Sequence, residues 1–254
     1  MKTFAKRIFV ACALTAVGLG GVIALPKHEQ PDRKFKVATE TAEPTTSTEP
    51  QTASGWSEAY DYEAPEPGTY ALPVLQDASD GTVVAPDGKP VRLHELLDGR
   101  VAILSFVYTR CADPRACLRA SSVLAELQQL SRQDQAVPDK LRLITLSFDP
   151  GYDTPEVMQR YGEVFSHDGG GANWLFLTTR NNHDLQPLLE AYGQRVDRRS
   201  KPSAFGPYQH TLRVYLIDSK KRIRNIYSYG LLDPRLVMAD VKTLIKEEEG
   251  VARN

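Results

Sequence analysis

Residues 101–118 read VAILSFVYTRCADPRACL and contain an apolar run, a short loop with two cysteines and the start of a helical pattern. The run Val101–Tyr108 is bounded and apolar throughout, as expected of a strand buried on both faces. Cys111 and Cys117 are the only cysteines outside the N-terminal apolar segment. A strand, a cysteine-bearing loop and a helix N-terminus in this order are typical of thiol chemistry on a thioredoxin-like scaffold.

The loop between the cysteines carries signals for the start of a helix. Asp113 is a good N-cap residue and Pro114 a good first helical residue, so we expect the helix to begin inside the loop. Cys117 then lies in the first helical turn, where free backbone N–H groups favour a thiolate. Arg110 and Arg115 add positive charge. Two such thiols can form a disulfide or bind a soft ion such as Cu(I), and the pair alone does not distinguish these outcomes.

The residues after 68 predict one α/β domain. Further strands are expected at 141–148, 174–178, 211–218 and 222–229, and helices at 94–97, 116–130, 154–165, 183–192 and 233–244. Short strands are expected within 69–84, around the turn at 79–81. Strands that alternate with helices and end in a hairpin and a helix predict a central sheet with flanking helices and an N-terminal strand extension.

His210 stands immediately before a strongly apolar strand, within residues 205–218. Thioredoxin-like disulfide exchange enzymes resemble one another in having a cis-proline at the corresponding place, opposite the cysteine loop. Here that place reads Gln209-His210-Thr211. An imidazole that faces two thiolates can complete a three-coordinate Cu(I) site, or a copper site of higher coordination with another ligand. Considered alone, a histidine at a strand end is usually an ordinary hydrogen-bonded side chain.

The N-terminus predicts export from the cytoplasm. Three cations within residues 2–7 precede the uncharged run Ile8–Leu25, whose roughly 18 residues fit a membrane-spanning helix or a long signal segment. We therefore expect residues 1–25 to be a membrane anchor, with a cleaved signal and a soluble exported protein as the alternative. Residues 26–67 are rich in Thr, Glu, Pro and Ser and predict a disordered tether, and residues 68–254 form the folded domain. The cysteine pair then faces the periplasm or an equivalent oxidising space.

The charge balance and the cysteine count exclude other classes of protein. The formal net charge of −1 gives no electrostatic case for a nucleic-acid partner. Three cysteines in 254 residues are too few for a fold held together by disulfides, so the core must be hydrophobic.

Several segments together resemble the Sco/SenC family of copper chaperones. They are the strand that ends in FVYTRC with the second cysteine, LSFDPGYDTPEVMQRY and HTLRVYLID, and the similarity covers about residues 68–244. The resemblance implies a thioredoxin-like fold, an N-terminal membrane anchor and copper held by Cys111, Cys117 and His210. It also implies maturation of the copper centre of cytochrome c oxidase, by copper delivery or by reduction of its cysteines. The implied partner is a copper-receiving oxidase subunit or another cuproprotein.

The cysteine spacing departs from that family's usual pattern. The family motif usually has three residues between the cysteines and often a proline directly after the second. This chain has five, residues 112–116, with Pro114 before Cys117 and Leu118 after it. Two alternatives follow: the thiolates still converge, or they lie far enough apart to alter the copper affinity, the redox potential or the choice of partner.

Other functions are open to the cysteine pair. A thiol–disulfide oxidoreductase would use Cys111 as the attacking thiol and Cys117 as the resolving thiol. In a non-catalytic adaptor the pair would form a structural disulfide, which stabilises so short a loop by on the order of 2 kcal/mol. A peroxidase fits less well, because the spacing Thr109-Arg110-Cys111 does not match the peroxiredoxin arrangement.

The segment DPGYDTP, residues 149–155, follows the second central strand, at the edge of the sheet where α/β proteins place their sites. Its composition suits a turn and a helix N-terminus, with Asp153 or Thr154 as the cap and Pro155 in the first turn. The alternatives are a docking role or a carboxylate that supports the site from behind. The other histidines with no cysteine nearby are interpreted as surface or core residues: His94, His167 and His183.

Overall fold

The computed structural model describes residues 62–166, 170–201 and 203–252, all within one compact unit. The expected anchor at 1–25, most of the expected tether and His167 lie outside these residues. Within the described ranges, no helix combines the length and the apolar content needed to cross a membrane.

A six-stranded mixed sheet forms the centre of the described domain, in the order β1-β10-β9-β4-β5-β6. Strands β4, β5 and β6 are parallel, β9 is antiparallel to β4, and β10 is antiparallel to β9. The predicted central strands and closing hairpin are thereby confirmed. The strands are β1 (Gln76–Asp77), β4 (Val101–Val107), β5 (Leu141–Ser147), β6 (Asn173–Leu177), β9 (Val214–Ile217) and β10 (Arg222–Tyr227).

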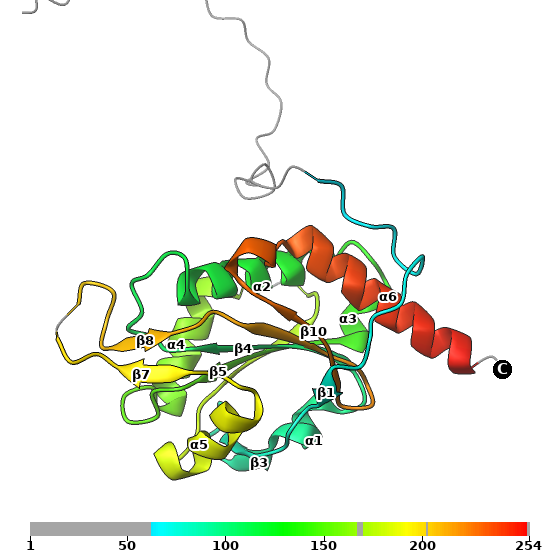
Figure 1. Cartoon of the computed structure of the whole chain (residues 1–254). Coiled ribbons are helices and arrows are strands. Elements are labelled where there is room, and N and C mark those ends of the chain that lie inside the picture. The colour runs from blue at the N-terminus through cyan, green and yellow to red at the C-terminus, as the bar shows by residue number, and fades with distance from the viewer. Residues whose placement is uncertain (1–61, 167–169, 202, 253–254) are drawn as a thin grey trace, which may run out of the picture. The chain divides into compact units, whose positions relative to one another are not determined.

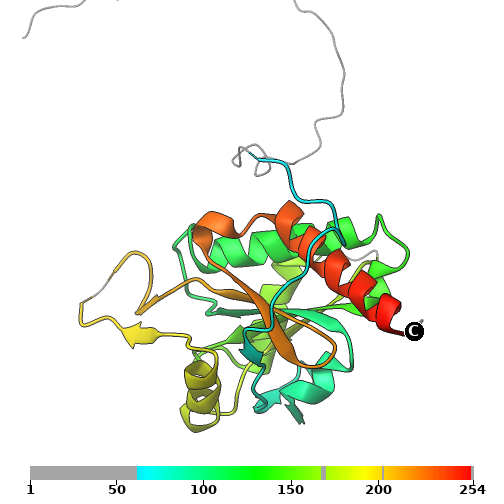
Figure 2. The ribbon, with the colours of Figure 1, turned by 45° about the vertical axis from the view of Figure 1, so that its right-hand side comes forward.

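Helices cover both faces of this sheet, as the sequence predicts. On one face α2 (Cys117–Ser131) packs beside α6 (Pro234–Ala252), with α3 (Val137–Lys140) next to them (Figures 1 and 2). α4 (Pro155–Phe165) packs against β6 and α2. The opposite side carries α1 (Leu93–Leu97), α5 (Asn182–Ala191) and a ribbon made of β2 (Thr82–Val84) and β3 (Pro90–Arg92).

β4 is buried along its whole length because β5 and β9 flank it and helices cover the sheet. All seven of its residues are buried, and six of them are apolar. Its one polar side chain, Ser105, forms a hydrogen bond with Thr145 of β5 at 3.2 Å. Burial of each such aliphatic side chain contributes about 1.5–3 kcal/mol, which fixes the position at which the cysteine loop leaves the sheet.

At two helix N-termini, side chains identified in the sequence accept hydrogen bonds from free backbone N–H groups. The Thr154 hydroxyl accepts a hydrogen bond from the Val157 N–H, and Pro155 is the first residue of α4, as predicted. Asp233 accepts from the Arg235 N–H in front of α6. The prediction that α6 ends near residue 244 is wrong, since the helix continues to Ala252.

A short hairpin of β7 (Val196–Arg198) and β8 (Tyr208–His210) was missed by the sequence analysis. Its register pairs Val196 with His210 and Arg198 with Tyr208. The hairpin projects from one end of the domain (Figure 1). The sequences VDR and YQH lack an apolar period and are separated by nine residues, so neither strand signal could be found.

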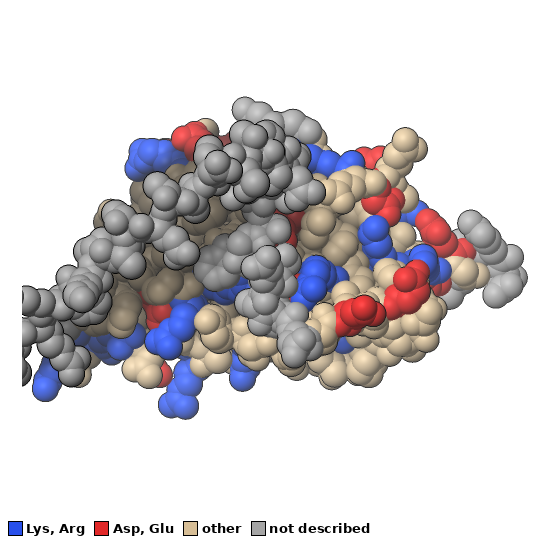
Figure 3. All heavy atoms as spheres, turned by 90° about the horizontal axis from the view of Figure 1, so that it is seen from above, with Lys and Arg blue, Asp and Glu red and all other residues tan. Residues whose placement is uncertain are grey.

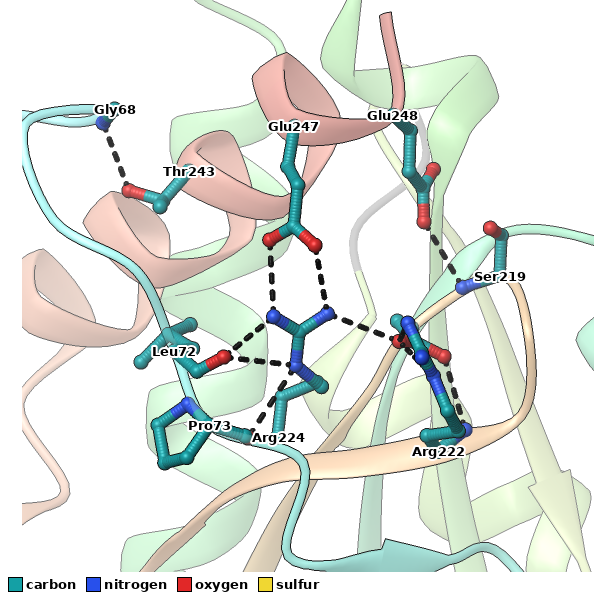
Figure 4. A network of polar contacts seen from close by, with 10 residues as sticks. Gly68, Leu72, Pro73, Ser219, Arg222, Arg224, Thr243, Glu247 and Glu248 are labelled. Atoms are coloured by element: carbon teal, nitrogen blue, oxygen red, sulfur yellow. Dashed lines mark hydrogen bonds and ion pairs between the residues drawn. The ribbon is translucent and has the colours of Figure 1, made fainter. Parts of the chain in front are cut away.

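The short strands expected within residues 69–84 are β1 and β2, and the segment before them, residues 69–75, lies along α6 and β10. Its carbonyl groups bond to a side chain instead of a neighbouring strand: the Arg224 guanidinium donates to Leu72 O and Pro73 O (Figure 4). The same guanidinium pairs with Asp218 at 3.0 Å and Glu247 at 2.9 Å. A buried arginine thus joins the N-terminal segment, β10 and α6.

Candidate metal centre

The cysteine loop begins at the end of β4, and the buried carboxylate of Asp153 holds its first residues in place. Asp153 is fully buried and accepts hydrogen bonds from the Thr109 backbone N–H at 3.1 Å, the Thr109 hydroxyl and the Ser147 hydroxyl. Burial raises the pKa of Asp153, although these three hydrogen bonds act in the opposite direction. Asp153 therefore fixes the first residues of the loop and is not the cap of α4.

The helix after the loop starts later than the sequence predicts. α2 begins at Cys117, and Ala116 precedes it without a side-chain cap. Asp113 and Pro114 form a separate turn: the Asp113 side chain accepts from the Arg115 N–H, and its carbonyl accepts from the Ala116 N–H. The prediction that Asp113 caps this helix is therefore wrong, because its side chain bonds to the Arg115 N–H in the turn that precedes the helix. Cys117 is the first helical residue, so its expected place in the first turn is confirmed.

His210 reaches the loop from the end of β8, just before the chain turns into β9. Its ring packs against Phe148, with ring centroids 4.9 Å apart, and edge-on against Tyr108 at 5.9 Å. The Nε2 atom faces the two thiols, while the buried Nδ1 atom has no hydrogen-bond partner among the described residues. Aromatic packing therefore orients this imidazole, and no carboxylate within the described part of the chain does so.

The five-residue loop still brings the thiols and the imidazole together. His210 Nε2 lies 3.4 Å from Cys117 Sγ and 4.0 Å from Cys111 Sγ, and the three atoms all lie within 4.8 Å of one another. An ion at about 2.3 Å from a thiolate and about 2.0 Å from an imidazole nitrogen, with an angle near 120°, separates sulfur and nitrogen by about 3.7 Å. The two distances lie on either side of this value, so the three atoms fit one ion.

The two thiols have pKa values that are shifted in opposite directions. A hydrogen bond from the Cys117 thiol, together with His210 and the backbone N–H groups of Cys117 and Asp113, lowers the pKa of Cys111 to about 4 against the opposing effect of burial. Burial, followed by the hydrogen bond and the charge of Cys111, raises the pKa of Cys117. Both thiols are free. The reduced pair therefore holds one thiolate and one thiol at neutral pH.

An ion pair that the sequence analysis did not identify connects the cysteine loop to the histidine strand. Arg110, next to Cys111, pairs with the buried Asp149 at 2.5 Å, and the Tyr208 hydroxyl donates to the same carboxylate at 3.1 Å. Tyr208 precedes His210 by two residues in β8, so Asp149 links both sides of the site. The segment DPGYDTP was interpreted mainly as a turn, with a supporting carboxylate as an alternative, and both Asp149 and Asp153 contact residues of the cysteine loop.

The other described histidines lie apart from this cluster. His94 Nε2 contacts Ala78 O at 2.8 Å, and the His183 side chain is almost fully exposed beside Asp184. Among the described residues, Cys111, Cys117 and His210 are the one group of three potential metal ligands that lie close together. The thioredoxin-like sheet and this cysteine–cysteine–histidine cluster define a domain with soft metal ligands at the C-terminal edge of its central strands.

Comparison with known proteins places the chain in one family. The model of the SCO1/SenC family matches residues 79–246, about two thirds of the sequence. The chain therefore belongs to the SCO1/SenC family. No curated protein sequence gives a significant match.

Solved structures share the fold. A copper-bound ScoI from Arabidopsis thaliana is 19% identical, with a TM-score of 0.57 over 67% of this chain and 98% of the other. The apo Sco1 protein from Thermus thermophilus is 25% identical, with a TM-score of 0.55 over 71% and 98%. BsSco, described as a member of the Sco family of cytochrome c oxidase assembly proteins, is 22% identical, with a TM-score of 0.53 over 69% and 98%. These likenesses confirm the thioredoxin-like fold.

Proposed function

We propose that this protein is a copper chaperone that binds Cu(I) through Cys111, Cys117 and His210 and supports assembly of the copper centre of cytochrome c oxidase. The observation that carries this proposal is the convergence of two sulfur atoms and Nε2 within 4.8 Å despite five residues between the cysteines. Family membership and the copper-bound Sco relatives support the same conclusion.

The chemistry of the ligands suits binding and release of a soft ion. Thiolates prefer Cu(I) to harder divalent ions, and the Cys111 thiol is already ionised at neutral pH, so only Cys117 must lose a proton when copper binds. Transfer then proceeds by ligand exchange, as thiols of the receiving protein replace those of Cys111 and Cys117. Oxidation of the pair to a disulfide removes both soft ligands, so copper loading depends on redox state.

The location proposed for this activity is the extracytoplasmic face of a membrane. The uncharged run at residues 8–25, the cations before it and the polar composition of residues 26–67 support an anchor and a tether, with a cleaved signal as the alternative. The folded domain at residues 68–254 would meet a copper-receiving oxidase subunit or another cuproprotein there.

A copper titration tests the proposal. Reduced protein is titrated with Cu(I) against a chromogenic Cu(I) chelator, and one equivalent is expected to bind. Cys111→Ala and Cys117→Ala each remove a thiolate ligand and are expected to abolish binding in competition with the chelator. His210→Ala removes the nitrogen ligand but leaves two sulfur ligands, and it is expected to weaken binding by at least about 10–100-fold, the loss that follows removal of a group that only supports a ligand.

His183→Ala is the matched control, because this exposed histidine lies outside the cluster and should leave the affinity unchanged. Equal copper binding by the wild type and a variant lacking both cysteines would show that the site is misassigned. In cells that lack the protein, the copper content of the oxidase should fall and should be restored by the wild type but not by Cys111→Ala.

The asymmetry of the two thiols favours a second candidate, a thiol–disulfide oxidoreductase. The Cys111 thiolate would attack a partner disulfide and release one partner thiolate, and Cys117 would then displace the second and leave a Cys111–Cys117 disulfide. The partner is reduced and this protein is oxidised by the same two electrons. Reduction of insulin disulfides that persists in His210→Ala would support this activity, because the imidazole is needed for copper but not for exchange.

A further inference from the structure

Positive charge is concentrated on the β7–β8 hairpin beside the site. Residues 195–213 contain five cations and a single carboxylate, Asp197, although the whole chain has 31 basic and 32 acidic residues. Figure 3 shows basic side chains along its left-hand and lower margins, and mixed charges at its right-hand end. The five cations are Arg195, Arg198, Arg199, Lys201 and Arg213.

These charges are only weakly compensated within the protein. Arg195 pairs with Asp197 at 3.3 Å, but both side chains are mostly exposed, and such pairs contribute little. Arg199 donates to the Tyr208 carbonyl, which carries no net charge. Arg198 and Lys201 are exposed and make no ion pair with any described residue. The hairpin therefore presents a positive surface that a partner can neutralise.

The hairpin is fixed against the cysteine loop. The Tyr108 hydroxyl donates to Phe205 O at 2.8 Å, and Gly206 lies against Tyr108 and the Arg110 carbonyl so closely that a Cβ there would be 2.4 Å from the tyrosine oxygen. Gly206 also has φ +96°, which favours glycine. These contacts, with the pairing of Val196 and His210, hold the cationic surface next to the thiols.

Exposed aromatic and apolar side chains accompany the cations around the site. Phe205 on the hairpin is 44% exposed and Tyr152 behind the cysteine loop is 49% exposed. The Arg110 guanidinium lies over the Tyr152 ring, 4.2 Å from its centroid. On the loop itself the Arg115 side chain is 70% exposed and forms a loose ion pair with Asp113 at 3.9 Å. Aromatic residues mixed with arginine are typical of protein interfaces, whereas lysine and glutamate are depleted there.

We propose that this cationic rim, defined as Arg115, Arg198, Arg199 and Lys201 with Phe205 and Tyr152, docks an acidic protein surface that carries the receiving thiols. The proposal rests on the proposed function, because a receiving protein must bring its own ligands to the site. Cys111 is 7% exposed and Cys117 is fully buried, so the receiving thiol has to be held against the loop for exchange. Opposite charges around the site orient this contact and accelerate it.

An anionic lipid surface is the other macromolecular partner that could neutralise the rim. A protein surface is favoured because the cations lie on the hairpin and the loop that carry the recessed candidate ligands, together with exposed aromatic side chains. A flat lipid surface would leave these ligands without an acceptor. Binding to vesicles is therefore one of the outcomes that the experiment must detect.

The experiment uses two synthetic peptides with the same dithiol sequence, flanked by glutamates in one and by glutamines in the other. Docking to the metal-free, reduced protein is followed by fluorescence anisotropy, and Cu(I) transfer by stopped flow. At low salt the glutamate peptide is expected to associate at least tenfold faster than the glutamine peptide, and the difference should disappear near 1 M salt.

The double variant Arg198→Ser/Lys201→Ser should lower the association rate of the glutamate peptide by about tenfold without changing Cu(I) affinity. The matched control Arg180→Ser/Lys220→Ser removes the same two residue types away from the hairpin and should change the rate by less than twofold. Equal effects of the two double variants, or equal rates for the two peptides, would overturn the proposal.

Vesicles of phosphatidylglycerol and of phosphatidylcholine distinguish a lipid partner. Strong binding to the anionic vesicles alone that is lost in Arg198→Ser/Lys201→Ser, together with equal rates for both peptides, would assign the rim to a membrane. If the protein fails to bind Cu(I) but still docks the glutamate peptide through the rim, the copper function fails and the docking surface stands.

Discussion

The two ends of the central sheet satisfy their polar groups in opposite ways. At the end where β9 turns into β10, each nitrogen of the Arg224 guanidinium has an acceptor, and together they reach Asp218, Glu247, Leu72 and Pro73. At the end where β4 enters the cysteine loop, His210 Nδ1 has no partner among the described residues, and its Nε2 lies 3.4 and 4.0 Å from two sulfurs that form no disulfide.

The polar groups at the Arg224 end therefore serve the stability of the fold, whereas those at the cysteine end remain available for binding. A buried charge is tolerated at the Arg224 end only because opposite charges and carbonyl groups surround it. The ligands at the cysteine end are oriented by groups behind them, Asp153, Asp149 and aromatic rings, while their own sulfur and nitrogen atoms keep bonding capacity. The fold thus places the three candidate ligands within reach of one ion, and the two described cysteines are not joined by a disulfide.

The largest effect is expected from Arg224→Ala. This change leaves Asp218 buried without one of its two arginine partners and leaves the Leu72 carbonyl without its donor, so the free energy of unfolding should fall by about 3–5 kcal/mol. Urea denaturation measures it. Arg222→Ala removes the more exposed partner of the same carboxylate and should cost about 1 kcal/mol. Equal costs for the two variants would show that the burial of Arg224 does not determine its contribution to stability.

The second prediction concerns the pH dependence of the cysteine end. With the Cys111 pKa at about 4, alkylation of this thiol in reduced, metal-free protein should stay constant from pH 8 to pH 5 and halve near pH 4. An ordinary thiol with a pKa of about 8.5 loses reactivity by almost 10³-fold over the same three pH units. Mass spectrometry should find Cys117 unmodified, because burial raises its pKa.

The same shift predicts a change of stability with pH. The pKa of Cys111 is lower in the folded than in the unfolded chain, so the unfolded chain binds the extra proton between about pH 4 and 8.5. The free energy of unfolding should therefore rise with pH across this window, and the gain should be absent in Cys111→Ser. A parallel pH dependence in both proteins would show that Cys111 is not the responsible group.

Asp149→Asn tests the contacts that Asp149 makes with Arg110 and Tyr208. We expect an effect on Cu(I) affinity that is smaller than that of removing a ligand. The amide keeps the size of the side chain but loses the charge that holds Arg110, so Cu(I) affinity should fall about tenfold. A readout without copper is the alkylation profile of Cys111, whose midpoint should move. Asp77→Asn, on the exposed strand β1, is the control and should change neither quantity.

The smallest effect is expected from Lys246→Ala at the opposite end. The ammonium group donates to Pro67 O at 2.8 Å in an exposed position, and such contacts change the free energy of unfolding by about 0.5 kcal/mol or less. A loss of more than 2 kcal/mol would mean that the N-terminal segment depends on this lysine as well as on Arg224.

The sequence predicts the parts of this fold whose signals are local. Apolar runs identify β4, β5 and β9, and Thr154-Pro155 identifies the start of α4. His210 was found because it precedes an apolar strand. Its distance to the cysteines could not be derived, since it depends on a hairpin whose short polar strands give no period.

The missed features of the site depend on contacts between distant segments. Asp113 and Pro114 have the composition of a helix start, but the Asp113 carboxylate bonds to the Arg115 N–H and forms a separate turn. Arg110, Asp149 and Tyr208 belong to three segments of the chain, and only the folded sheet brings them together. Spacing alone could not show that a five-residue loop still lets the ligands converge.

The attachment of residues 62–75 determines how the domain responds to mechanical tension. Gly68 and Tyr70 bond to Thr243 and Asp240 of α6, and Leu75 bonds to Ile223 of β10. A pull on the chain ahead of Tyr62 therefore acts first on α6 and β10, and it reaches β4 and the cysteine loop only through these elements. The point where tension enters the domain is thus separated from the three candidate ligands by a helix and by the strands of the sheet.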